Sequence, residues 1–270
     1  NLYPDACILL VDTYDVLKSG VHAIRVFKEM QAEGIELKGY GIRIDSGDLA
    51  YLSKQAYKML KEAGFEDAII SASSDLDEYL IDSLKAGAKV NSWGVGTNLI
   101  TSKGHPAFGG VYKLAAIKNK EDEDFIPKIK LSENVEKVTN PGNKTIFRIY
   151  DKATGKIRAD LICLADEVFD PEKDMIIFDP MATWKKTKIE GGTYTLRELL
   201  VPDSKKGECV YTSPSVMEIR DICQKEKQTL WGETLRLVNP QEVYVDLSDK
   251  LYKIKSDLLE EMSQAAIKNE

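Results

Sequence analysis

Charged and hydroxyl side chains stand at the ends of three apolar segments near the start of the sequence. Asp12 follows the first segment, Arg43 and Asp45 lie at the end of the second, and Ser74 follows the third. The carboxyl ends of parallel strands line the active sites of α/β sheets, so these side chains are candidates for a single site. Acids, a cation and hydroxyl groups together are suited to binding a phosphorylated small molecule.

The arginine of the second segment lies between two isoleucines, in Ile42-Arg43-Ile44. Burying a guanidinium group in a strand is costly unless it meets an anion. The sequence leaves two candidate partners for this arginine. One is an anionic ligand, and the other, which is the commoner case, is an aspartate on a neighbouring strand.

An acidic turn, Asp45-Ser46-Gly47-Asp48, follows this arginine. Carboxylates beside a Ser-Gly turn can hold Mg²⁺ together with water molecules, as sites for phosphorylated substrates often do. The same residues also suit the start of a helix, because Ser and Asp side chains accept hydrogen bonds from the first backbone N–H groups. The two interpretations are compatible.

A glycine-rich segment, Gly94-Val95-Gly96-Thr97, follows the fourth expected strand. Glycine lets the backbone approach a ligand closely, and adjacent N–H groups can surround an anion. The motif is weak by itself, but its position after a strand favours a phosphate site. Lys113, which follows Gly109-Gly110, offers a cation that could reach the same anion.

The elements that position these residues are expected to be βα units. Strands begin near residues 7, 40, 68 and 90, and amphipathic helices lie between them; the third helix is expected to begin around Ser74 and Asp77. This spacing is typical of a parallel sheet. Four units form half of a (β/α)8 barrel or the edge of a doubly wound sheet, and a full barrel takes roughly 250 residues.

The pattern changes after Phe108 to short alternating segments that predict antiparallel strands. We expect these strands at residues 111–117, 129–131, 145–150 and 157–164. A strand at 175–178 and helices at 215–228 and 248–268 follow. We therefore divide the chain into a partial α/β barrel (1–107), a mostly β region (108–168) and a C-terminal α+β region (169–270).

Composition limits the classes of function. The 37 basic and 44 acidic residues give a net charge of −7, which argues against a nucleic-acid partner or an anionic membrane surface. No apolar run approaches the ~20 residues of a membrane span.

The four cysteines form no CxxC pair, which predicts reduced thiols and a cytoplasmic protein. The sequence begins with Asn1 and shows no targeting peptide, so its start resembles the middle of a domain.

Five motifs resemble nicotinate phosphoribosyltransferases, and they occur in the order in which that family has them. They are LVDTYD at 10–15, GIRIDSGDL at 41–49, WGVGTNL at 93–99, FGGVYKL at 108–114 and KVTNPGNK at 137–144. One such motif could arise by chance, but five in order are specific. The resemblance extends to about residue 165 and is looser in the tail, so the chain resembles the C-terminal portion of such an enzyme.

This resemblance implies a fold and a reaction. The fold is α/β: part of a type II phosphoribosyltransferase incomplete (β/α) barrel, followed by antiparallel β segments and a C-terminal α+β region. The reaction joins nicotinate to phosphoribosyl pyrophosphate, giving nicotinate mononucleotide and pyrophosphate in NAD biosynthesis. The implied cofactors are Mg²⁺ and ATP, the latter as a co-substrate whose hydrolysis improves the reaction.

The resemblance also implies roles for the candidate residues. Arg43 would bind the pyridine carboxylate, and Asp12 and Asp45 would face the ribose and the Mg²⁺–pyrophosphate region as the catalytic pair. The other substrate-binding candidates are Ser46, Gly47, Ser74, Gly94, Gly96, Thr97 and Lys113. Gly94, Gly96 and Thr97 would surround the 5′-phosphate, and Lys113 would be a further contact to an anion. No residue is assigned as a direct metal ligand.

The histidine that couples ATP in the family would lie upstream of Asp12, and neither His22 nor His105 matches its context. The expected partners are therefore the two substrates, together with a homodimer mate or the missing N-terminal part. Two alternatives stay open: a non-catalytic nucleotide-binding fragment or assembly subunit, and a related phosphoribosyltransferase that uses nicotinamide or quinolinate. We expect this chain by itself to be inactive.

Overall fold

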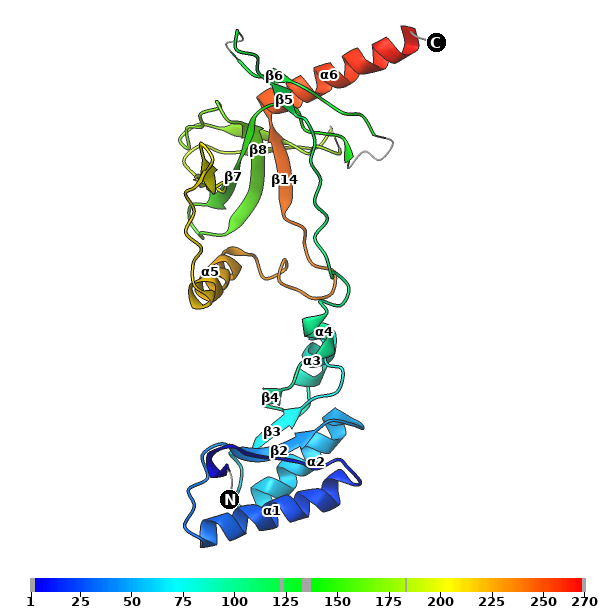
Figure 1. Ribbon diagram of the computed structural model, residues 1–270, viewed down its shortest axis with the longest axis vertical. Helices are drawn as coiled ribbons and strands as arrows, with labels where there is room; N and C mark the ends of the chain where they lie inside the picture. Colours follow the sequence, from blue (N-terminus) through cyan, green and yellow to red (C-terminus); the bar gives the residue numbers. More distant parts are fainter. Residues whose placement is uncertain (1–2, 122–123, 133–136, 183, 269–270) are drawn as a thin grey trace. The chain divides into compact units, whose positions relative to one another are not determined.

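The chain forms two compact units, Asn1–Gly109 and Gly110–Glu270. The computed structural model describes residues 3–121, 124–132, 137–182 and 184–268. Strands and helices alternate in the first unit (Figure 1). After a short 3₁₀ helix at Pro4–Ala6 they are β1 (Cys7–Leu10), α1 (Val16–Ala32), β2 (Tyr40–Ile44), α2 (Leu49–Glu62), β3 (Ile69–Ala72), α3 (Glu78–Lys85), β4 (Ser92–Trp93) and α4 (Thr97–Ile100).

The four strands of the first unit form a parallel sheet in the order β1-β2-β3-β4. Arg43 on β2 pairs in register with Leu10 on β1 and with Ser71 on β3. The predicted βα repeat is therefore confirmed. A parallel sheet with its helices on one face has the arrangement of half a (β/α) barrel.

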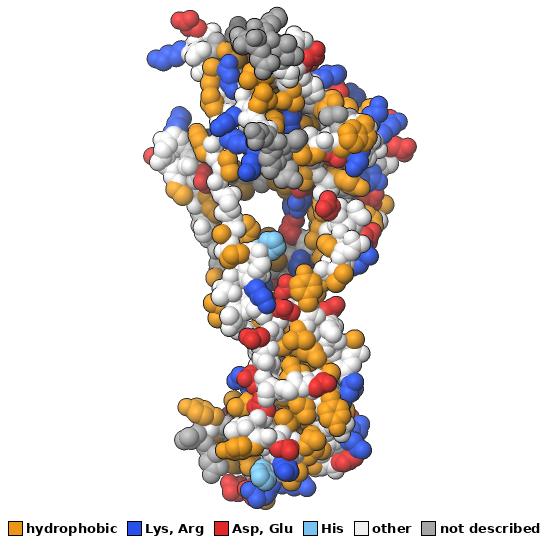
Figure 2. All heavy atoms as spheres, turned by 90° about the vertical axis from the view of Figure 1, so that its right-hand side faces the viewer, with side chains coloured by type: hydrophobic (Ala, Val, Ile, Leu, Met, Phe, Trp, Pro, Cys, Tyr) orange, Lys and Arg blue, Asp and Glu red, His pale blue; other side chains and the backbone are white. Residues whose placement is uncertain are grey.

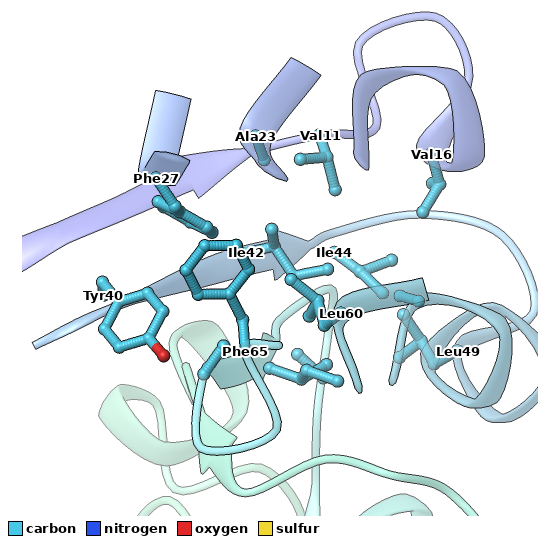
Figure 3. Packing of buried hydrophobic residues seen from close by; sticks show 14 of the residues in the cluster. Val11, Val16, Ala23, Phe27, Tyr40, Ile42, Ile44, Leu49, Leu60 and Phe65 are labelled. Atoms are coloured by element: carbon cyan, nitrogen blue, oxygen red, sulfur yellow. The ribbon is translucent and has the colours of Figure 1, made fainter. Parts of the chain in front are cut away.

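The two faces of this sheet differ in their environment. One face packs under α1 and α2, where Phe27 lies edge to face with Tyr40 at 5.1 Å and with Phe65 at 5.6 Å between ring centroids (Figure 3). Side chains alternate along a strand, so Arg43 and its neighbour Leu10 lie on the opposite face. Leu10 is 54% exposed there, so this face is left uncovered within the unit.

Three aspartates begin the first three helices. Asp15 accepts hydrogen bonds from the backbone N–H groups of α1, Asp48 does so for α2, and Asp77 for α3. The third helix was expected to begin around Ser74 and Asp77. Asp77 does begin it, but the expectation is wrong for Ser74, which lies outside the helix. Ser74 has a φ of 86°, which is incompatible with a right-handed helix, so α3 begins only after Asp77.

The second unit is built around a six-stranded sheet of order β10-β9-β14-β8-β7-β11. All its neighbouring strands are antiparallel except β14 and β8. The elements of the unit are β5 (Ala116–Ile117), β6 (Ile126–Pro127), β7 (Lys144–Asp151), β8 (Ile157–Leu164), β9 (Met175–Phe178), β10 (Lys186–Ile189), β11 (Tyr194–Glu198), β12 (Ser204–Lys205), β13 (Glu208–Cys209), α5 (Val216–Thr229), β14 (Tyr244–Ser248) and α6 (Asp249–Lys268).

The sheet of the second unit curls around one core. Ile189 on β10 and Tyr194 on β11 come from opposite edges, yet they share a buried cluster with Leu161 and Ile177. β7 and β8 pair with strands that come after residue 168, so one sheet spans the regions described above as the mostly β region and the C-terminal α+β region. Long-range pairing of this kind leaves no local signal in the sequence.

The antiparallel strands predicted at 145–150 and 157–164 are confirmed as β7 and β8. Of the strand predicted at 111–117, only Ala116–Ile117 forms, and it pairs with Ile126–Pro127 rather than with 129–131. Val111 and Tyr112 are 79% and 101% exposed, so the alternating pattern there does not reflect a buried face.

Charged residues of both signs are interspersed on the face of the protein shown in Figure 2, and no extended basic patch appears there. Among the residues that the structure describes, no helix combines the length and the apolar character needed to cross a membrane.

We predict that Gly41→Ala destabilises the first unit by at least about 3 kcal/mol, the upper range for overpacking. An added Cβ would overlap the backbone of Ile69 on the neighbouring strand, which cannot move without breaking the sheet. Gly20→Ala is the matched control. Its Cβ would lie 3.6 Å from Met59 Cε, and alanine should stabilise helix α1 by about 1 kcal/mol. Urea unfolding followed by circular dichroism measures both, and equal effects would contradict the prediction.

Candidate functional site

A polar cavity of about 340 Å³ lies at the carboxyl ends of β2, β3 and β4. It is lined by Arg43, Asp45, Ser73, Ser74, Asp75, Gly94, Gly96 and Thr97. Six of these eight residues were candidates from the sequence alone, and they come from three separate βα units. The structure thus brings the strand-end residues together around one concave surface.

Backbone hydrogen bonds beyond the strand ends hold this surface together. The N–H of Val11 donates to the carbonyl of Arg43 (3.1 Å), and the N–H of Ser73 donates to that of Ile44 (3.0 Å). Gly94 N–H donates to Ala72 in the same way (2.8 Å). The three turns that carry the candidate side chains therefore begin in a fixed register.

Arg43 is held at the cavity by two neighbours. Its Nε donates to Ser73 Oγ (2.9 Å), and its Nη2 donates to Asp45 Oδ1 (3.2 Å). The Ser73 hydroxyl donates in turn to the same Asp45 oxygen. The hydrogen bonds from Ser73 and Arg43 hold the pKa of the Asp45 carboxyl below its usual value. The guanidinium is therefore paired with an aspartate, but that aspartate follows its own strand rather than lying on a neighbouring one.

Asp12 joins the first strand end to the second. Its Oδ2 accepts from the backbone N–H of Asp45 (3.0 Å) and from the Ser46 hydroxyl (2.7 Å). Gly47 completes the turn with a φ of 82°, and a Cβ there would lie 2.9 Å from Leu52 Cδ1. Asp48 then begins α2, so the helix-start interpretation of this acidic turn is correct for that residue.

The two glycines of the fourth strand end differ in their surroundings. A Cβ at Gly94 would lie 3.2 Å from Ser73 Cβ, so glycine there lets the two turns approach each other. A Cβ at Gly96 would meet no described atom within 4 Å, because it would project into open space. Thr97 begins the short helix α4. Phosphate binding at this turn remains a prediction.

Sequence reasoning did not name Ser73 as a site residue. It is only 4% exposed, and its hydroxyl joins Arg43 to Asp45. The signal was its even spacing from Ser71, which pairs with Arg43 and lies on the same face. Lys113 lies in the second unit, where its ammonium group donates to the carbonyl of Lys137.

Comparison with known proteins identifies the relatives of this chain. Residues 143–255 match the family model described as the nicotinate phosphoribosyltransferase C-terminal domain. The nicotinate phosphoribosyltransferase of Bacillus subtilis is 44% identical over 96% of this chain and 53% of its own length. That of Caenorhabditis elegans is 34% identical over 93% of this chain and 45% of its own length.

A solved structure agrees with these relatives. The crystal structure of human nicotinic acid phosphoribosyltransferase matches 96% of this chain and 48% of its own chain, with a TM-score of 0.68 and 25% identity. The chain spans about half the length of the relatives it matches. The resemblance carried by the sequence motifs is therefore confirmed, and the chain is similar to nicotinate phosphoribosyltransferases over about half of their length.

We predict that Ser73→Ala raises the pKa of Asp45, because the serine hydroxyl is the main cause of its lowering. The folded-state pKa lies below the unfolded value of about 3.9. Asp45 therefore stabilises the fold above that pH, and the stabilisation is lost as pH falls through the folded-state pKa. Titration of the Asp45 carboxyl carbon by NMR measures the shift. Ser71→Ala is the control and should leave this titration unchanged; an equal effect of both variants would contradict the assignment.

We predict that Ser74→Gly stabilises the first unit by about 0.5–1 kcal/mol. Ser74 has a φ of 86°, which costs a residue with a Cβ about 1–2 kcal/mol, and the greater freedom of unfolded glycine offsets part of that gain. Ser71→Gly, within strand β3, should instead destabilise by a similar amount. Thermal unfolding of both variants tests this, and a loss of stability in Ser74→Gly would show that the serine side chain has a compensating contact.

Proposed function

We propose that this chain, as a relative of the nicotinate phosphoribosyltransferases, forms the part of such an enzyme that binds nicotinate and the phosphoribosyl group. The whole protein would convert nicotinate and phosphoribosyl pyrophosphate to nicotinate mononucleotide and pyrophosphate, with ATP as a co-substrate, in NAD biosynthesis. Since the chain spans about half of its relatives, the activity is proposed for the whole protein and not for this part alone.

The observation that carries the proposal is the way Arg43 is held. Its side chain is half exposed at the cavity, with Nε bonded to Ser73 and Nη2 to Asp45. Its Nη1 has no hydrogen-bond partner among the residues that the structure describes. A guanidinium group presents two hydrogen-bonding edges, so the edge formed by Nη1 and Nη2 remains available for two parallel bonds to a planar carboxylate. Nicotinate carries such a carboxylate, and nicotinamide does not.

Asp12 and Asp45 are proposed to bind the ribose hydroxyls and the pyrophosphate region. The described residues contain no group of three or more His, Cys, Asp or Glu side chains that could hold a metal ion. Mg²⁺ usually takes one or two protein carboxylates and completes its shell with substrate phosphates and water. Asp12 fits that role, because its hydrogen bonds occupy Oδ2 and leave Oδ1 without a partner among the described residues. When bound, Mg²⁺ would neutralise charge on the departing pyrophosphate.

The glycine-rich turn is proposed to bind the 5′-phosphate. Gly94 and Gly96 leave the backbone of this turn accessible at the cavity, next to Thr97 and Ser74. Open space beside Gly96 supports this proposal, since a ligand atom could occupy it. Ser46 and Gly47 would lie at the ribose side, in the turn that Asp12 fixes.

The chemistry needs positioning more than a protein nucleophile. The C1′–oxygen bond to pyrophosphate breaks, positive charge develops on the ribose, and the pyridine nitrogen forms the new bond to C1′. Arg43 would orient the ring through its carboxylate, and the carboxylates of Asp12 and Asp45 would stabilise the developing positive charge. No side chain has to accept a covalent intermediate.

Further features are proposed for the whole protein. Its fold would be the type II phosphoribosyltransferase fold, and Lys113 would be an additional contact to an anion. We expect a homodimer, or association with the remaining part of the enzyme, because the sheet face that carries Leu10 is uncovered in the first unit. A cytoplasmic location is supported by the four free thiols, Cys7, Cys163, Cys209 and Cys223.

We predict that Arg43→Ala, in the whole protein that contains this chain, lowers kcat/KM for nicotinate by roughly 10- to 100-fold, the loss of a charge-assisted bidentate pair. The KM for phosphoribosyl pyrophosphate should change much less. Arg43→Lys should recover little, because an ammonium group cannot form two parallel bonds to a carboxylate.

Arg25→Ala is the matched control, because Arg25 is an exposed arginine on α1 that forms an ion pair with Glu29 on the same helix. Steady-state kinetics with each substrate varied in turn measures all three variants. Unchanged use of nicotinate by Arg43→Ala would refute the carboxylate assignment. A protein that turns over nicotinamide as well as nicotinate would favour the related enzymes instead.

A further inference from the structure

A second cavity, of about 370 Å³, lies entirely within the second unit. Its walls are mostly apolar and come from the strands of the curled sheet, with Ile157 and Ala159 on β8, Ile177 on β9 and Ile189 on β10. Two aromatic side chains, Trp231 and Tyr244, complete the lining. None of these residues has a role in the function proposed above.

The cavity exists because two neighbouring strands separate. β14 pairs with β9 only at its end, through Leu247 with Phe178 and Ser248 with Ile177. The first residues of β14 pair only with β8, where Tyr244 lies opposite Ala159. Beside Tyr244 the sheet therefore has no ladder to β9, and the space between the strands is open to a ligand.

The segment 230–243 covers this space, and hydrogen bonds fix its position. Trp231 Nε1 donates to the carbonyl of Ile157 (2.6 Å), and Lys156 Nζ donates to that of Leu230 (2.9 Å). The N–H of Gln241 donates to Glu233 (3.0 Å), which closes the segment on itself. The cavity is therefore formed before any ligand arrives, as most small-molecule sites are.

Taken together with their ion-pair partners, the charged side chains of the cavity lining carry a net negative charge. Both cations in the lining are neutralised by partners of their own: Arg158 by Asp151 (2.6 Å) and Lys188 by Asp174 (2.7 Å). Glu233 and Glu242 also belong to the lining, and both are exposed residues. Neither has an ion-pair or hydrogen-bond partner among the described side chains, so the lining carries uncompensated negative charge.

A buried acid lies on the same strand as Tyr244, although it is not among the residues that line the cavity, and burial together with the nearby Asp179 raises the pKa of its carboxyl group. Asp246 lies two residues after Tyr244 and hence on the same face of the strand, and it is only 4% exposed. It has no hydrogen-bond or ion-pair partner in the part of the chain that the structure describes. A buried carboxyl group without a partner is unusual, because burial normally requires a hydrogen bond or a counter-charge.

We propose that this cavity binds a small organic cation, with an ammonium or quaternary ammonium group attached to an apolar body. The apolar walls would bury the body, and Trp231 and Tyr244 would face the cationic group, as aromatic residues do in sites for quaternary ammonium ligands. Glu233 and Glu242 supply the complementary charge. The site is independent of the one that contains Arg43, since it rests on different residues in the other unit.

The test uses phenyltrimethylammonium as the cationic probe and benzenesulfonate as an anion of similar shape. Both are titrated into the whole protein by calorimetry, and tryptophan fluorescence is recorded in parallel. The cation should bind with a Kd of about 1 mM or tighter, and the anion at least tenfold more weakly. Trp231→Phe should remove the fluorescence response to the cation.

Three variants make the test specific. Glu233→Gln combined with Glu242→Gln should weaken the cation at least tenfold, whereas Glu208→Gln, on the separate hairpin β12–β13, should not. Thr187→Trp should fill the cavity from its exposed rim and abolish binding without disturbing the core. Circular dichroism verifies that each variant is folded. Absence of cation binding at 10 mM, a preference for the anion, or binding that survives Thr187→Trp would each overturn the proposal.

Discussion

The candidate site depends on one shared hydrogen-bond network, in which Asp12 and Ser73 connect the ends of three strands. Asp12 accepts from the backbone and side chain of the turn after β2, and Ser73 bridges Arg43 and Asp45 from the end of β3. Neither connection is local, since each joins residues about thirty positions apart. The network can form only when the parallel sheet is in register, so the folding of the first unit and the assembly of the site are the same event.

The hydrophobic core supplies that register. Tyr40, Ile42 and Ile44 alternate along β2 and bury their side chains under α1 and α2 (Figure 3). A shift of one residue would place these apolar side chains on the uncovered face and Arg43 in the core. The cost of burying an unpaired guanidinium group therefore acts together with aromatic packing to fix the strand. Gly41 restricts the register of β2 further, because a side chain at this position would overlap the backbone of β3.

Sequence reasoning found the parts of the molecule whose signals are local. Apolar runs followed by polar turns located β1 to β4, and the strand-end rule grouped residues that the structure brings to one cavity. It did not find the joining role of Ser73, since a serine gains that role only through the register of two strands. The sheet that spans residue 168 leaves no local signal for a similar reason, because β14 inserts between β8 and β9 from more than sixty residues further along the chain.

The charge at the cavity indicates why a chain that spans about half of its relatives would not be sufficient for the proposed reaction. The charged groups that line it are Arg43, Asp45 and Asp75, so one positive and two negative charges give a sum of −1. Asp12, which adjoins them, makes the local charge more negative still. Nicotinate and phosphoribosyl pyrophosphate are both anions, so the negative charge of these residues opposes their binding. Binding both would require positive charge from outside this set, from Mg²⁺ and from cationic residues elsewhere in the whole protein. Arg43 would then contribute orientation and specificity for a carboxylate, while most of the attraction for the phosphate groups would come from those other cations.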